Sequence, residues 1–125
     1  MTLEEINNKI RERLLDGRGQ AVSRGHCVYW SLDDNCCAIG CLLKEHYSRE
    51  MEGSSIDSRV SISKGKWISL DDDYAPSAKL AEVLNKSDIP ATPEVLRALI
   101  RWQDRHDTTA NWDGKRYIGP LRDPS

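Results

Sequence analysis

The four cysteines of the chain lie close together in sequence, at Cys27, Cys36, Cys37 and Cys41. A nucleophilic cysteine requires a lowered thiol pKa and a base within hydrogen-bonding reach. Cys37 is expected in the first turn of a helix, where unsatisfied backbone N–H groups and the helix dipole favour a thiolate. His106 ends an apolar helical stripe and is the candidate base. A cysteine hydrolase or transferase is therefore one candidate function.

Such an enzyme would need an acid to orient the imidazole, and Asp107 follows His106 directly. The candidate catalytic residues are thus Cys37, His106 and Asp107. Neighbouring helical residues do not face one another, so Asp104 or Asp33 would suit the orienting role better. The residues around Cys37 match no local signature of a cysteine peptidase, and a histidine on an apolar face is more often a core residue. Catalysis is therefore less favoured than binding.

The cysteine spacing also permits a structural zinc site. Three residues separate Cys37 from Cys41, Cys27 lies upstream, and one of His26, His46 or His106, with His106 preferred, would complete four ligands. The second closely spaced pair that is typical of zinc sites is missing, and free cysteines are more often small buried hydrophobic residues. We therefore predict neither a metal nor a cofactor, and a zinc-stapled binding module is the second alternative.

An α+β fold is expected to position these residues: a small single domain with about four helices around a buried central helix, plus a short β-hairpin. The predicted central helix is 36–47, because its first half carries no polar side chain apart from thiols. Gly40 inside it predicts a close approach of another backbone. The other helices are expected over about 3–16, from Pro76, and from Thr92 to about His106.

The predicted hairpin lies in the middle of the chain. Residues 59–63 and 66–70 alternate polar and apolar side chains around a Lys-Gly turn. We interpret 54–73 as a hairpin insertion within a single domain spanning 1–125. The last segment, 113–125, is expected to be irregular.

The charge balance excludes several classes of protein. The 125 residues include 18 Lys and Arg and 20 Asp and Glu, giving a formal net charge of −2. This excludes a generally basic nucleic-acid binder and a strongly acidic DNA mimic. No apolar run approaches the length of a membrane span, and the acidic, helical N-terminus is unlike a signal peptide. We expect a cytoplasmic protein with reduced thiols, whose oligomeric state the sequence does not specify.

Several segments together resemble a known family. The most specific is Cys-Ala-Ile-Gly-Cys-Leu at 37–42, accompanied by Gly-His-Cys-Val-Tyr at 25–29 and by His-Asp at 106–107. They are similar to a family of small uncharacterised proteins encoded by tailed phages and by bacterial genomes that carry prophages. The resemblance covers about 25–53 and 94–112, and it implies a phage setting rather than a reaction.

By analogy, a small phage protein without a full catalytic signature acts by binding. The leading prediction is an accessory protein that inhibits a bacterial host or defence factor, in the manner of an anti-CRISPR protein. Aromatic and basic residues make good interface anchors, and the insertion is rich in residues that look exposed. The predicted partner-binding residues are Lys64, Lys66, Trp67, Asp71, Asp72 and Asp73.

Overall fold

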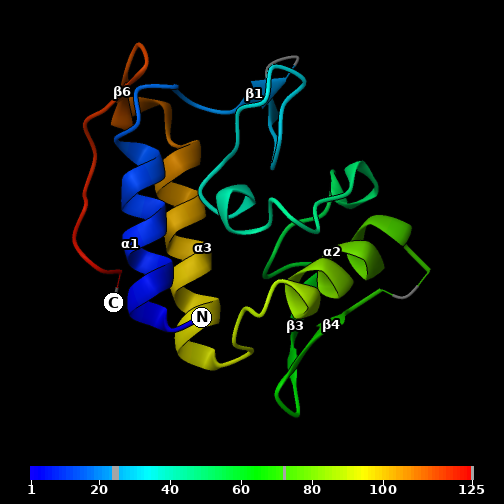
Figure 1. Cartoon of the computed structure of the whole chain (residues 1–125). Coiled ribbons are helices and arrows are strands. Elements are labelled where there is room, and N and C mark those ends of the chain that lie inside the picture. The colour runs from blue at the N-terminus through cyan, green and yellow to red at the C-terminus, as the bar shows by residue number, and fades with distance from the viewer. Residues whose placement is uncertain (24–25, 72, 125) are drawn as a thin grey trace.

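Three α-helices dominate the computed structural model, which describes residues 1–23, 26–71 and 73–124 (Figure 1). They are α1 (Leu3–Leu14), α2 (Ala75–Lys86) and α3 (Pro93–Asp107). Helices α1 and α3 lie side by side, while α2 packs on a hairpin. The α+β class is confirmed, with three α-helices in the described residues instead of about four. None of these helices is long and apolar enough to cross a membrane.

The helices begin where local signals predict. The Thr2 hydroxyl accepts a hydrogen bond from the Glu5 N–H at 3.1 Å, and the Glu5 carboxylate accepts one in return from the Thr2 N–H at 3.3 Å. At α3 the Thr92 hydroxyl accepts from the Val95 N–H at 3.3 Å. Each bond satisfies a donor that the first helical turn would leave without a partner.

Helices α1 and α3 are joined by a buried polar contact as well as by apolar packing. The Trp102 indole N–H donates to the Asn7 side-chain oxygen at 2.8 Å, and both residues are buried. Ile6, Ile10 and Leu14 form the buried stripe of α1. The helix pair therefore forms a rigid support for residues near the end of α3.

The predicted central helix at 36–47 is wrong, although its burial is as expected. The segment contains a short 3₁₀ turn, η1 (Gly40–Leu42), and otherwise bends and turns. The Cys37 N–H donates to the Tyr29 carbonyl at 3.0 Å, so its backbone bonds reach across to another segment. A Cβ on Gly40 would lie 2.0 Å from that same carbonyl oxygen. The predicted close backbone approach at Gly40 is confirmed, and it excludes a larger residue there.

The predicted hairpin in the middle of the chain is confirmed. Strands β3 (Val60–Ser63) and β4 (Lys66–Ser69) pair antiparallel, with Ser63 opposite Lys66. Lys64 and Gly65 both have positive φ, at 52° and 76°, as a tight two-residue turn requires. Helix α2 covers both strands. The hairpin lies at the opposite side of the molecule from α1 (Figure 1).

Short antiparallel pairs flank the helix pair. Strands β1 (Val22–Ser23) and β2 (His26–Cys27) pair near the end of α3. The segment predicted to be irregular, 113–125, instead begins within a hairpin of β5 (Trp112–Asp113) and β6 (Arg116–Tyr117). Tryptophan and tyrosine residues in register hold that hairpin, with ring centroids 5.2 Å apart. Two further 3₁₀ turns are η2 (Arg49–Met51) and η3 (Thr109–Asn111).

Candidate functional site

His106 lies inward on α3, as predicted, and is fully buried. Its Nε2 accepts a hydrogen bond from the Ala21 backbone N–H at 3.2 Å, and its Nδ1 lies 2.8 Å from an Asp107 carboxylate oxygen. Because a backbone amide can only donate, Nε2 must be unprotonated. The ring proton therefore resides on Nδ1 and is donated to Asp107. Both ring nitrogens are occupied, so the ring has no lone pair left for a base or a metal ligand.

The pairing of His106 with Asp107 differs from the expectation for adjacent helical residues. Asp107 is the last residue of α3, and its carboxylate turns back along the helix, where the Gln103 side-chain amide also donates to it at 2.9 Å. The expectation that Asp104 or Asp33 would serve this histidine better is therefore wrong. Helix ends relax the geometry that separates neighbours within a helix.

Cys37 does not have the surroundings of a nucleophile. It is fully buried outside any α-helix, and its sulfur accepts a hydrogen bond from the Gly40 N–H at 3.2 Å. Burial raises the pKa of the Cys37 thiol to about 12. The lowered pKa that a helix N-terminus was expected to give is absent. None of the hydrogen bonds described for His106 involves Cys37.

A different cysteine meets the histidine. The sulfur of Cys27, a ring nitrogen of His106 and a carboxylate oxygen of Asp107 all lie within 4.8 Å of one another. Zinc commonly takes three such ligands, but a neutral histidine that binds metal through Nδ1 carries its proton on Nε2. A proton on Nε2 would face the Ala21 N–H, which already donates to that nitrogen, so two donors would meet there. Burial, followed by the Asp107 charge, raises the pKa of the Cys27 thiol to about 12, which further opposes metal binding.

The four predicted zinc ligands are not brought together in the described part of the chain. Cys27 and His106 meet, but the Cys37 sulfur faces the Gly40 N–H and the Cys41 thiol donates to the Ala38 carbonyl at 2.9 Å. The prediction of a Cys27, Cys37, Cys41 and His106 set is therefore wrong in geometry. The turns at 36–43 aim the two later thiols in different directions.

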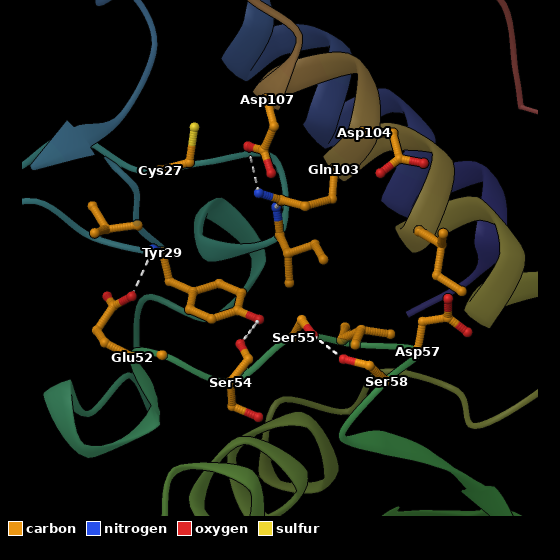
Figure 2. A pocket seen from close by; sticks show the side chains of 15 residues that line it. Cys27, Tyr29, Glu52, Ser54, Ser55, Asp57, Ser58, Gln103, Asp104 and Asp107 are labelled. Atoms are coloured by element: carbon orange, nitrogen blue, oxygen red, sulfur yellow. Dashed lines mark hydrogen bonds between the residues drawn. The ribbon is translucent and has the colours of Figure 1, made fainter. Parts of the chain in front are cut away.

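A pocket of about 450 Å³ opens beside Cys27 and Asp107 (Figure 2). Three segments distant in sequence, together with Ile39, form it: residues 27–29, residues 52–58 and the face of α3 that includes Ile100 and Asp104. Tyr29 and three isoleucines contribute apolar surface to its lining. Lining carboxylates come from all sides, and none of the described residues that line the pocket is Lys, Arg or His. The four carboxylates belong to Glu52, Asp57, Asp104 and Asp107.

Two of these carboxylates hold the fold together. Glu52 accepts hydrogen bonds from the backbone N–H groups of Tyr29 at 3.0 Å and Trp30 at 3.1 Å, and from the Tyr47 hydroxyl. Asp107 accepts from His106 and a glutamine as described above. These two charges are therefore committed to the protein's own donors.

The other two carboxylates face solvent. Asp57 and Asp104 are exposed, and neither carboxylate has a hydrogen-bond or ion-pair partner among the residues that the structure describes. Asp57 lies in a left-handed turn at φ 91° and lines the pocket from the 52–58 segment, whereas Asp104 and Asp107 line it from α3. The lining of the pocket thus combines apolar side chains with carboxylates. Such a surface accommodates a group with an apolar stem and a cationic tip.

The predicted partner-binding surface on the insertion is not assembled as expected. Trp67 is 2% exposed, and its indole N–H donates to the Ile89 carbonyl at 2.8 Å. The expectation of an exposed tryptophan is therefore wrong, because α2 and the following loop cover β4. Lys64 and Lys66 are exposed at the hairpin turn, whereas Asp71 lies at the other end of β4, paired with Arg59 at 3.2 Å.

The acidic end of the insertion is described only in part. Asp73 is exposed, and Asp72 lies outside the described residues. The lysines and the acids are therefore separated by the length of the hairpin. Whether they contact a partner remains a prediction.

Sequence reasoning did not identify the pocket. Glu52 lies within the resemblance at 25–53 but was not named as a site residue, and Asp57 carries no motif. Other lining residues lie near 27 and 104, so spacing alone gave no signal. No protein family, curated protein or solved structure matches the chain.

Proposed function

We propose that the protein acts by binding a partner protein, and that the pocket between residues 27–29, residues 52–58 and α3 receives a basic side chain of that partner. One observation carries the proposal. Among the described residues, the pocket is lined by four carboxylates and by no cationic side chain, and two of those carboxylates, Asp57 and Asp104, have no partner there.

An arginine suits this pocket better than a lysine. Its aliphatic stem can pack against Tyr29 and Ile100, and its planar guanidinium can bind one carboxylate with two parallel hydrogen bonds. Partly exposed ion pairs contribute only about 0.2–1 kcal/mol each. The carboxylates would therefore supply selectivity and fast association, while neighbouring contacts would supply most of the affinity.

Binding is favoured over catalysis for two reasons. The Cys37 thiol has its pKa raised to about 12 by burial, and both nitrogens of His106 are occupied. The resemblance to phage-encoded proteins supports a bacterial host or defence protein as the partner. An anti-CRISPR-like inhibitor is one form of this proposal.

A direct test uses a defined cationic probe. The ¹⁵N-labelled protein is titrated with N-acetyl-arginine amide and, separately, with N-acetyl-citrulline amide, which has the same shape without the charge. We expect weak, salt-sensitive binding of the arginine compound alone, with shifts concentrated at residues 52–58 and 103–107. A variant carrying Asp57→Asn and Asp104→Asn should lose these shifts.

A matched variant controls for net charge. Asp73→Asn with Asp113→Asn removes the same charge from exposed sites outside the pocket, and it should bind as the wild type does. Equal binding of both compounds would refute the proposal. Shifts scattered over the whole surface, or unchanged in the Asp57 and Asp104 variant, would do so too.

A further inference from the structure

A second pocket, of about 400 Å³, gathers lysine side chains from three parts of the chain. Lys9 comes from α1, Lys44 from the turn that follows η1, and Lys86 from the last position of α2. These positions are far apart in sequence, so the charges are brought to one pocket only in the folded chain. None of the three lysines lines the pocket beside Cys27.

The three lysines differ in how they are engaged. Lys86 has a structural explanation, because it pairs with Glu82 at 3.1 Å and ends α2, where the helix dipole favours a cation. Lys9 and Lys44 are exposed, and neither ammonium group has an ion-pair or hydrogen-bond partner in the described part of the chain. Two positive charges are therefore available to an anion from outside.

Two carboxylates also line this pocket, and they do not cancel the lysines. They belong to Glu45 and Asp88, so three ammonium groups face two carboxylates and the lining remains positive. The Asp88 carboxylate already faces another cation, the amino group of Met1, at 3.7 Å. Positive charge along a concave surface concentrates the potential and attracts anions.

The hydroxyl of Ser87, which lines the same pocket, gives an independent indication of a ligand. Its Oγ is the one buried side-chain oxygen or nitrogen without a hydrogen-bond partner among the described residues. Buried polar groups are nearly always hydrogen-bonded, so such an atom requires an explanation. A serine hydroxyl turns about a single bond, and an acceptor oxygen placed in the pocket can supply the missing partner.

A phosphate group fits these observations better than a carboxylate does. Lysine binds phosphate as a point charge, and the phosphate oxygens point in several directions, so donors from separate elements can reach them at once. A carboxylate suits the planar fork of arginine, and none of the described residues that line this pocket is an arginine. A volume of about 400 Å³ lies at the small end of the range for small-molecule sites.

We propose that the pocket between α1, the turn after η1 and the end of α2 binds a phosphate group, either as the free ion or as an ester of a small molecule. Lys9 and Lys44 supply the charge, and the Ser87 hydroxyl donates a hydrogen bond to a phosphate oxygen. The proposal is independent of the proposed binding function, because the two pockets share none of the described lining residues.

The test titrates the ¹⁵N-labelled protein with inorganic phosphate near neutral pH, while sodium chloride holds the ionic strength constant. We expect saturable chemical-shift changes concentrated at residues 9, 41–46 and 86–88. Changes that do not saturate, or that are scattered over the whole surface, would overturn the proposal.

A second titration distinguishes the two sources of the phosphate group. Glycerol 3-phosphate is compared with inorganic phosphate, and glycerol serves as the blank. Tighter binding of the ester would identify a phosphorylated small molecule as the ligand, and equal or weaker binding would identify the free ion. Tighter binding of a short single-stranded oligonucleotide than of either would overturn the assignment to a small ligand.

Three variants locate the site. Lys9→Gln with Lys44→Gln should weaken phosphate binding several-fold, and Ser87→Ala should weaken it to a smaller extent. Lys64→Gln with Lys66→Gln is the matched control, because it removes the same charge from exposed positions outside the pocket, and it should bind as the wild type does. Equal losses in the two double variants would overturn the proposal, since net charge rather than the pocket would then hold the anion. All four lysines are exposed, so these changes should preserve the fold, which the spectrum of each free variant checks.

Discussion

Cys27 and Cys36 belong to the same short stretch of chain, yet their surroundings carry opposite charge. The Cys27 thiol faces the Asp107 carboxylate, and its pKa is raised to about 12 by burial and by that charge. The Cys36 sulfur lies 3.6 Å from an Arg18 guanidinium nitrogen, and its pKa is lowered to about 7, first by the Cys41 thiol and then by the charges of Arg13 and Arg18. Residue type alone therefore does not set the pKa of a thiol; burial, hydrogen-bonding groups and the charge beside the sulfur do.

The two regions also differ in what they can receive. Around Cys27 the free groups are carboxylates on an open pocket, which suits a cation. Around Cys36 the arginines are already bound to other groups of the protein, and the sulfur is buried. The close approach of Gly40 to the Tyr29 carbonyl connects the segment that carries Cys36 with the segment that lines the pocket.

The largest expected effect comes from breaking that connection. Gly40→Ala would place a Cβ 2.0 Å from the Tyr29 carbonyl oxygen, which is backbone and cannot easily move. We expect the free energy of unfolding to fall by about 3 kcal/mol or more, at the upper end of what overpacking costs. Urea unfolding measures the loss of stability. Changes in the chemical shifts of both Cys27 and Cys36 would show that the two regions are disturbed together.

Gly17→Ala is the control for that prediction. Gly17 has φ 81°, and a Cβ added there would meet nothing within 4 Å, so the change should cost about 1–2 kcal/mol through backbone strain alone. If Gly40→Ala costs no more than Gly17→Ala, the close approach at Tyr29 is not a constraint on the fold.

A smaller effect should distinguish the structural carboxylates from the free ones. Glu52→Gln removes a charge that accepts two backbone N–H groups and the Tyr47 hydroxyl, and it should cost about 2 kcal/mol of unfolding free energy. Asp104→Asn changes an exposed carboxylate without a described partner, and it should alter the free energy of unfolding by less than about 0.5 kcal/mol. Similar losses for both variants in urea unfolding would erase the distinction.

The smallest effect is a pH dependence that Cys36 alone should produce. Its pKa is lowered from 9.0 to about 7 on folding, so its thiolate adds stability that is complete above about pH 9 and is lost as the pH falls to about 7. Between about pH 7 and pH 9, the free energy of unfolding of the wild type should rise by about 1–2 kcal/mol more than that of Cys36→Ser. Parallel pH profiles for the two proteins would contradict this contribution.

The sequence predicted the elements that are set by local chemistry. The capping residues Thr2 and Thr92 placed two helix beginnings, and Lys64 with Gly65 placed the hairpin turn. The run at 36–47 was recognised as buried, but an apolar run does not distinguish a buried helix from a buried turn whose backbone bonds reach another segment. Tertiary hydrogen bonds to Tyr29 decided that case.

The sites depended still more on tertiary structure. The importance of His106 was predicted from its place on an apolar stripe, but its partners Ala21 and Cys27 come from a segment far away in sequence. The lowered pKa of Cys36 depends on arginines from α1 and from the loop after it. The spacing of residues in the sequence does not predict which charged side chains become neighbours on folding.

The most direct test of the contrast between the two regions measures the alkylation rate of each cysteine as a function of pH. A small thiol reagent is applied to the native protein, and the four positions are quantified separately by mass spectrometry. We predict that Cys36 reacts with a midpoint near pH 7, while Cys27 and Cys37 remain unmodified until well above pH 9. If Cys27 reacts before Cys36, the charges assigned to the two regions do not govern their thiols, and the contrast between them is wrong.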